Sequence, residues 1–233
     1  MSETTYLALL LDGPLQSWGF ASRFQRRTTG LHPTKSGVVG LICAAMGLAK
    51  GSTEELAMLP ELAKLKMSSI AIPRDVQGAA SLLPVLRLED YHTVLDTRRA
   101  SGAMNKDAVV TRRQYLLEAR FGVILVGDRS VLERAAAALQ DPVWGVWLGR
   151  KSCIPAEPIF RGTFKMRAEA ERALIGDASI DQFTRLEEVA NFEAGTDSYN
   201  DQPVSFGTSD SSAEGRGYSV RRVNLIVGKI PDA

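Results

Sequence analysis

Short apolar runs separated by turn residues divide the chain into alternating strands and helices. The run over 6–11 is continuously apolar and is ended by Asp12, Gly13 and Pro14, which predicts a buried strand followed by a turn. By the same criteria, further strands are predicted over 67–73, 82–95, 109–117, 121–126, 143–148, 185–192 and 218–227. Apolar residues at helical spacing predict helices over 35–49, 54–64 and 129–139.

Capping residues and polar stretches place the ends of these elements. Thr34 and Asp128 stand where two of the helices begin, and both side chains can accept a backbone N–H bond there. Gly51 suits the position just past the end of the first helix. Residues 96–107 are predicted to form a loop or the tip of a projecting hairpin, and 195–217 a long loop.

The order of the elements favours one class of fold. Up to residue 148 the order is strand, helix, strand, insertion, strand, helix, strand, which is the split β-α-β order of ferredoxin-like domains. The remainder is less regular and strand-rich. No internal repeat and no coiled-coil heptad pattern are found in the sequence.

Composition excludes several classes of protein. The chain has 233 residues, of which 45% are hydrophobic and 24% charged, as in ordinary globular proteins. It has no apolar run of about 18 residues, so no membrane span is expected, and its first residues do not resemble a signal peptide. Cys43 and Cys153 form no CxxC pair and are expected to be reduced thiols in a cytoplasmic protein. With only two histidines, a zinc site of the His/Cys type is not expected.

The formal net charge of +1 conceals an uneven distribution along the chain. Residues 13–53 contain five basic residues and no acidic one, and 96–120 and 145–168 are also mainly basic. Residues 169–214 are mainly acidic, with only Arg172 and Arg185 opposing. Separate basic segments of this kind indicate either a polyanion site built from distant stretches or solvated surface arginines. The charge pattern alone leaves both interpretations open.

Three short segments are candidate anion or base contacts. The helix start at 33–37 offers free N–H groups, hydroxyls and the Lys35 ammonium to a phosphate, although the local sequence favours plain N-capping by Thr34. Trp18 lies in a glycine-flanked loop before several arginines, where it either stacks on a base or packs in the core. The segment 149–152 follows a predicted strand and contains two basic residues, Arg150 and Lys151, which makes it a second candidate anion site.

Motifs for catalysis are missing. The segment 47–53 lacks the GxxxxGK[ST] order of a phosphate loop, and no GxSxG motif is present. Metal-independent RNA cleavage needs a base, an acid and a cation near the 2′-hydroxyl, which His92, Tyr91 or Tyr115, and a lysine could supply. Nothing in the spacing of these residues requires that role.

Five motifs resemble one known family. They are GPLQSWG (13–19), PTKSGVVGL (33–41), DYHTV (90–94), TRRQYL (111–116) and LGRKSC followed by proline (148–155). In this order the sequence resembles the CasD family of type I-E CRISPR Cascade complexes, within the RAMP superfamily. The motifs span most of the chain up to residue 161, and the last third matches more loosely.

The resemblance implies an α+β fold. A ferredoxin-like (RRM/RAMP) domain would occupy 1–160, with a β-hairpin thumb inserted around 82–117, and a smaller, mostly β domain would occupy 161–233. The resemblance also implies a non-catalytic subunit that anchors the 5′ handle of the CRISPR RNA (crRNA) in antiviral defence. One copy of this subunit would be present in a cytoplasmic hetero-oligomeric complex. The implied partners are crRNA, the CasC backbone subunit and the CasA large subunit, with an indirect contact to target DNA left open.

A related protein of type I-C systems cuts repeat RNA, so the alternative function is that of a metal-independent endoribonuclease. The DYHTV and TRRQYL motifs look like the I-E branch, which favours the non-catalytic subunit. No cofactor, metal or membrane is implied. Carried onto this sequence, the resemblance gives the following RNA-contact candidates: Gln16, Ser17, Trp18, Arg23, Arg26, Arg27, Lys35, Ser36, Gly37, Arg98, Arg99, Met104, Lys106, Arg112, Arg113, Arg150 and Lys151.

Overall fold

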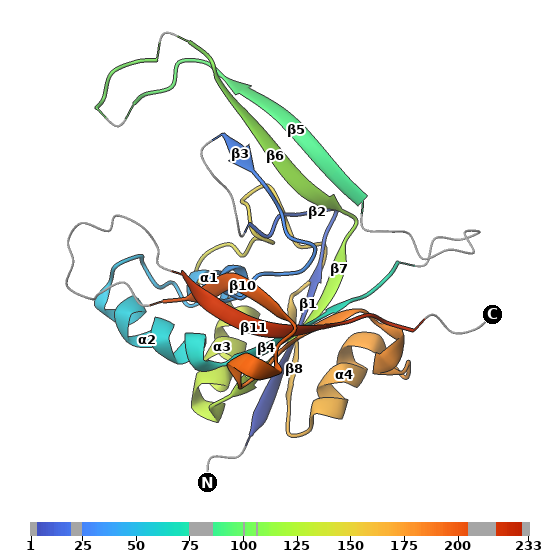
Figure 1. The fold of residues 1–233 in the computed structure, drawn as a ribbon. Coiled ribbons are helices and arrows are strands. Elements are labelled where there is room, and N and C mark those ends of the chain that lie inside the picture. The colour runs from blue at the N-terminus through green and yellow to red at the C-terminus, as the bar shows by residue number, and fades with distance from the viewer. Residues whose placement is uncertain are drawn as a thin grey trace.

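A large antiparallel sheet forms the body of the molecule (Figure 1). The computed structural model describes residues 4–19, 25–74, 86–99, 101–105, 107–204 and 218–229. Within these ranges the large sheet has the strand order β10-β11-β9-β4-β7-β1-β8. Its strands are β1 (Thr5–Asp12), β4 (Lys66–Ala71), β7 (Arg120–Gly127), β8 (Phe160–Phe164), β9 (Arg185–Glu188), β10 (Asp197–Pro203) and β11 (Tyr218–Ile226).

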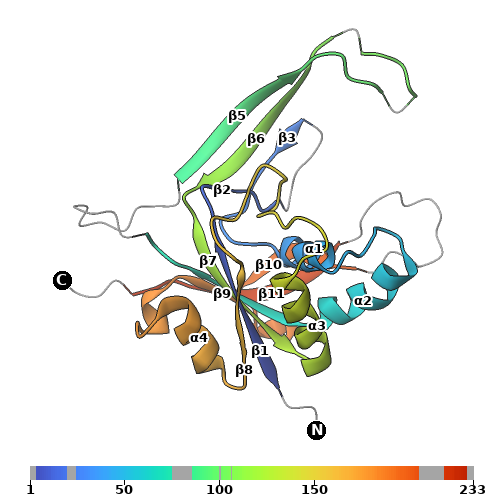
Figure 2. The same ribbon diagram turned by 180° about the vertical axis from the view of Figure 1, so that it is seen from behind.

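Helices cover both faces of the large sheet (Figures 1 and 2). They are α1 (Lys35–Ala45), α2 (Thr53–Lys64), α3 (Arg129–Gln140) and α4 (Arg167–Ile175), with short 3₁₀ helices at Ile180–Gln182 and Phe192–Ala194. On β1, Leu7, Leu9 and Leu11 pack with α1, α2 and α3, whereas Ala8 and Leu10 pack with α4. Burial on both faces explains why the sequence of β1 is continuously apolar. None of the helices in these ranges is long and apolar enough to cross a membrane.

A second, smaller sheet is built around β6 (Val109–Leu117). The strand β5 (Leu86–Val94) pairs with its whole length, and the resulting hairpin projects away from the helices (Figure 1). The two-residue strands β2 (Leu15–Gln16) and β3 (Arg26–Arg27) pair with β6 at different points along its length. β6 leads into β7 through Glu118, which has a φ of 50°. The hairpin is therefore joined directly to a central strand of the large sheet.

The predicted strands over 67–73, 109–117 and 121–126 are confirmed, and so are the N-caps Thr34 and Asp128. The first helix, however, ends at Ala45 and not at residue 49. Gly47 takes a positive φ of 70° just past its end, and its N–H donates to Ala44 O at 3.0 Å. Because Leu48 N–H also donates to Cys43 O, this end is a Schellman motif. Gly47, and not Gly51, therefore ends the helix.

The strand predicted over 143–148 is absent from the structure. Val143 N donates to Ala45 O at 2.8 Å and Trp144 N to Ala44 O at 3.3 Å, so this segment bonds to the last carbonyls of α1, of which Ala44 O also accepts from Gly47 N. The next strand along the chain is instead β8, which pairs antiparallel with β1. Val143 and Trp144 gave this segment the apolar pattern of a strand, but both side chains are exposed.

The last third of the chain contains more secondary structure than its sequence predicted. Helix α4 was not predicted, and β10 lies inside the stretch predicted as a loop over 195–217, of which 205–217 fall outside the described residues. β9 pairs antiparallel with β4, so β9, β10 and β11 continue the sheet begun by the first 160 residues. The division into domains at residue 160 stays a prediction, and the sheet runs through it.

Candidate nucleic-acid interface

Four arginines from distant parts of the sequence meet where β3 pairs with β6. The parallel register places Arg26 beside Arg112 and Arg27 beside Arg113, and we refer to these four residues as the arginine quartet. Directly opposite residues point to the same face of a sheet, so each face carries two neighbouring guanidinium groups. None of the four has an ion-pair partner among the residues that the structure describes. Because like charges placed opposite one another repel, an anion bound between them would stabilise this arrangement.

The face that carries Arg26 and Arg112 also presents an aromatic ring. Tyr91 on β5 is the register partner of Arg112, whose Cζ lies 5.8 Å from the centroid of the Tyr91 ring. The Tyr91 side chain is 63% exposed. An exposed ring beside a guanidinium group can stack on a base while the cation holds a phosphate.

A polar cleft of ≈ 1160 Å³ opens on the same face, at the base of the hairpin. Gln114 is two residues from Arg112 and Arg87 is four residues from Tyr91, so strand alternation puts these four side chains on one face. Both Gln114 and Arg87 line the cleft. The lining also includes Thr28, Thr29, Gly30, Ser36, Asp197, Ser198, Tyr199, Asn200 and Tyr218. The cleft thus runs from the arginine-bearing sheet to strands β10 and β11.

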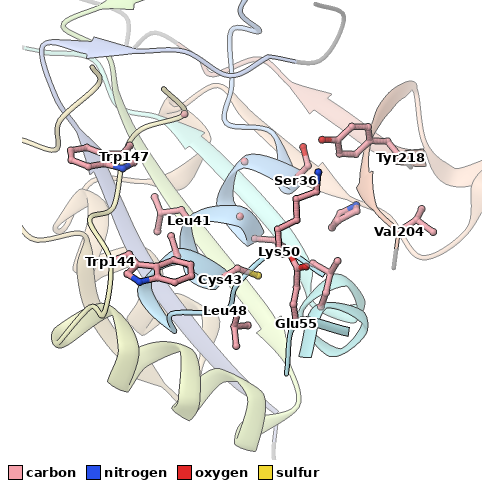
Figure 3. A pocket seen from close by; sticks show the side chains of 17 residues that line it. Ser36, Leu41, Cys43, Leu48, Lys50, Glu55, Trp144, Trp147, Val204 and Tyr218 are labelled. Carbon is pink, nitrogen blue, oxygen red and sulfur yellow. The ribbon is translucent and has the colours of Figure 1, made fainter. Parts of the chain in front are cut away.

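A smaller, more apolar pocket of ≈ 330 Å³ lies over α1 (Figure 3). Trp144 and Trp147 lie on one side of the helix, and Val204 and Tyr218 on the other (Figure 3). Tyr218 and Ser36 line both this pocket and the polar cleft. The two hollows therefore adjoin at the N-terminal end of α1.

The basic loop after Leu148 is held tightly against the end of β2. Leu148 N donates to Cys153 O at 2.8 Å and Ser17 N donates to Leu148 O at 3.0 Å. Gly149 has a φ of 96°, and a Cβ there would lie 1.8 Å from Ser17 O, so no other residue fits without displacing the backbone. From this loop Arg150 points back to the small sheet, whereas Lys151 is exposed.

The tip of the hairpin presents further candidates. Arg98 and Met104 form an isolated bridge, and Arg99 Nε donates to Asn105 Oδ1 at 2.7 Å. Met104 is 49% exposed, and both arginines are exposed. The tip thus has a defined turn with two cations and an apolar side chain at its surface. The candidates Lys106 and Arg23 lie outside the described residues.

Gln16 and Trp18 are buried, which corrects the expectation that they contact RNA. Trp18 is 1% exposed, and its Nε1 donates to Gln16 Oε1 at 2.9 Å. Gln16 Nε2 donates to the carbonyls of Leu11 and Ala119, so this amide joins three segments of the core. Ser17 is also buried, with its hydroxyl donating to Gln114 O. Of the two interpretations of Trp18, the core interpretation is confirmed.

The start of α1 does not offer a free phosphate site. Lys35 N donates to Asp201 Oδ2 at 2.8 Å, so a carboxylate of the chain itself occupies the helix N-terminus. The Lys35 ammonium is buried and pairs with Glu188 at 2.9 Å. Gly37 packs against Trp18, whose ring a Cβ at Gly37 would approach to 2.9 Å. Lys35 is therefore not available to a phosphate, the contact expected at Gly37 stays a prediction, and Ser36 alone of the three lines the cleft.

The carboxylates that occupy this position come from the acidic segment. Asp201 accepts two bonds from Arg221, at 2.9 and 2.7 Å, and both side chains are buried. Glu188 also accepts a bond from Met67 N. Burial lowers the pKa of Lys35 below its ordinary value, an effect that the neighbouring Glu188 carboxylate opposes. Acidic residues of the last third of the chain thus neutralise buried cations of the same chain.

The residues considered for RNA cleavage do not form a catalytic group. Tyr91 and His92 are consecutive on β5 and so point to opposite faces of the hairpin. Tyr115 is buried under the guanidinium of Arg150, at 4.7 Å. The nearest carboxylate to His92 Nδ1 is that of Asp90, at 3.9 Å. Among the described residues, no three His, Cys, Asp or Glu side chains are grouped as metal ligands would be.

Comparison with known proteins identifies the family. Residues 6–224 match the family model described as CRISPR-associated protein (Cas_Cas5). The chain belongs to this family. It is 33% identical over 175 residues to the CRISPR system Cascade subunit CasD of Escherichia coli strain K12, with 73% of this chain and 76% of that protein covered. The resemblance seen in the five motifs is thereby confirmed.

Solved structures show the same fold. A chain of a CRISPR RNA-guided surveillance complex has a TM-score of 0.71 and 26% identity, with 97% of this chain and 90% of that chain covered. A crystal structure of a Cas protein has a TM-score of 0.62 and 28% identity, with 97% and 100% covered. This likeness confirms the predicted combination of helices and strands in one fold, which the structure builds on a large antiparallel sheet.

Proposed function

We propose that this protein is a non-catalytic, crRNA-binding subunit of a type I-E Cascade complex, and that it anchors the 5′ handle of the crRNA. Family membership and the likeness to a chain of an RNA-guided surveillance complex support this assignment. The observation that carries it is the unpaired arginine quartet, which places four cations on one small sheet. Such a surface attracts a phosphate backbone.

The RNA path that we propose follows the face with Arg26, Arg112 and Tyr91 and enters the polar cleft. Backbone phosphates would lie on the arginines, and a base would stack on the exposed Tyr91 ring. The hairpin tip, with Arg98, Arg99 and Met104, and the exposed Lys151 would extend this surface. Gln16, Trp18 and Lys35 are part of the scaffold in this proposal.

We further propose that the hairpin β5–β6 is the thumb of a ferredoxin-like domain and that it packs against the CasC backbone subunit. The sheet order β4-β7-β1-β8, with antiparallel pairs throughout, supports the ferredoxin-like assignment. The exposed residues Leu86, Leu88 and Leu95 along β5 and after it give the hairpin an apolar surface for a protein partner. The CasA large subunit is the second partner in this proposal.

The RNA path can be tested with two double variants of equal charge. Arg26→Ala/Arg112→Ala removes the cations of the cleft face, and Arg134→Ala/Arg172→Ala removes two exposed cations from α3 and α4, at the other end of the molecule (Figure 1). We expect the first variant to weaken binding of labelled handle RNA and to lower the slope of log K against log [salt] by roughly 1.4, since each single-strand phosphate contact contributes about 0.7. The second variant should keep the wild-type slope. Equal slopes for the wild type and Arg26→Ala/Arg112→Ala would contradict the proposed path.

The same RNA tests the absence of catalysis. We expect the full chain, incubated with labelled repeat RNA in EDTA, to bind without cutting it, because His92 and Tyr91 point to opposite faces and Tyr115 is buried. Specific cleavage that His92→Ala abolishes would favour the metal-independent endoribonuclease instead.

A further inference from the structure

The side chain of Arg150 joins two strands of the small sheet. Its Nη1 donates to Gln114 O on β6 at 3.1 Å, and its Nη2 donates to Arg27 O on β3 at 3.0 Å. Its Cζ lies 4.7 Å from the centroid of the buried Tyr115 ring, also on β6. Both donor nitrogens and the flat face of the guanidinium group are therefore in contact with protein.

The strand that Arg150 holds is very short. β3 consists of Arg26 and Arg27 alone, and its parallel ladder to β6 extends over two residue pairs. A two-residue ladder supplies few hydrogen bonds, so the bridge from Arg150 to Arg27 O is a substantial part of what keeps β3 beside β6. Half of the arginine quartet comes from β3, and the separation of its guanidinium groups depends on this pairing.

The loop that carries Arg150 is itself fixed. Leu148 and Cys153 are fully buried on either side of it, and Gly149 lies against the Ser17 backbone. Arg150 O accepts a bond from Cys153 N at 2.8 Å. The guanidinium group is thus presented from a rigid base, which suits a positioning role better than a mobile phosphate contact does.

We propose that Arg150 is a positioning residue: its guanidinium group clamps β3 to β6 and so sets the spacing of the arginine quartet, without itself binding phosphate. This inference rests on the proposed function, since it assigns the quartet to RNA. A lysine cannot replace Arg150, because a single ammonium lacks the planar fork that reaches two carbonyls and the flat face that stacks on Tyr115.

The test compares Arg150→Lys, which keeps the charge, with Lys151→Ala, which removes a neighbouring exposed charge and keeps the clamp. The Arg112 amide, which donates to Gln25 O at 2.8 Å, reports on the pairing of β3 with β6. In the RNA-free chain, we expect Arg150→Lys to accelerate hydrogen exchange of that amide and Lys151→Ala to leave it unchanged. We also expect Arg150→Lys to weaken handle RNA binding by about tenfold, although the net charge is the same.

Two results would overturn this role. Unchanged exchange with weaker binding would make Arg150 a direct RNA contact, and faster exchange with unchanged binding would make the clamp merely structural. Failure of the proposed function is distinguishable from both, because Arg26→Ala/Arg112→Ala would then bind RNA like the wild type whatever Arg150→Lys does to exchange.

Discussion

At the scale of single residues, burial decides the role of a cation. Lys35 and Lys151 are both lysines in motifs that resemble the CasD family, yet the first is buried against Glu188 and the second is exposed. Their local sequences are equally consistent with phosphate binding. Only the partner that each ammonium meets in the fold separates a scaffold residue from a candidate RNA contact.

Lys35→Met keeps the apolar stem of the side chain and removes its charge. We expect this variant to lose several kcal/mol of unfolding free energy, because it leaves Glu188 partly buried without its closest cation. Its salt slope for RNA binding should stay at the wild-type value, measured where both proteins are folded. Lys151→Met is the matched control, with little change in urea unfolding and a slope lower by about 0.7. A reduced slope for Lys35→Met would place Lys35 on the RNA after all.

At the scale of elements, ends and connections matter more than the apolar pattern. The helix α1 ends where Gly47 can take a positive φ, and the segment after Asp141 donates to the last carbonyls of that helix and forms no strand. The loop after Leu148 likewise depends on one glycine that touches the chain at Ser17. Such contacts join segments that lie far apart in the sequence. The apolar periodicity within one segment cannot predict them.

Gly149→Ala tests the contact between this loop and β2. Both Gly149 and Gly51 have positive φ values, 96° and 79°, but a Cβ at Gly51 would meet no atom within 4 Å. Gly51→Ala should therefore cost only the backbone strain, about 1 kcal/mol. Gly149→Ala adds a collision with Ser17 O, so we expect a clearly larger loss of unfolding free energy in urea. Equal losses of unfolding free energy for the two variants would show that the loop can move away from Ser17 O at no cost in stability.

At the scale of the whole molecule, the acidic last third stabilises the basic first part. Asp201 and Glu188 reach Lys35 at the start of α1, and β9 extends the large sheet at β4. The net charge of +1 therefore conceals two kinds of cation. Some, such as Lys35, pair with carboxylates inside the fold, and others, such as the arginine quartet, have no ion-pair partner among the described residues. Of the second kind, we assign to RNA the arginine quartet, the hairpin-tip arginines and Lys151.

This arrangement predicts that the chain unfolds as one unit. Asp201→Asn removes the closest carboxylate of the buried Arg221 guanidinium and leaves only Glu188, whose Oε2 lies 3.7 Å from Nη1. Breaking a buried ion pair in this way costs about 3–5 kcal/mol. We expect calorimetry to show one transition for the wild type and the same single transition, at lower temperature, for the variant. Arg172→Ala, which breaks an exposed pair with Asp177, should change the transition little. Two separate transitions would support independent domains that meet near residue 160.

The sequence by itself determined the family, most of the strands and the starts of α1 and α3, because these depend on local patterns: apolar runs, capping side chains and motifs in a fixed order. The cluster of Arg26, Arg27, Arg112 and Arg113 was predicted only as separate basic stretches, since nothing local reveals that β3 and β6 pair. The tertiary structure alone decided that Trp18 and Lys35 are buried and that Asp201 caps α1. Charge and hydrogen bonding are satisfied between distant segments, so the role of each polar residue is set by the neighbour that the fold brings to it.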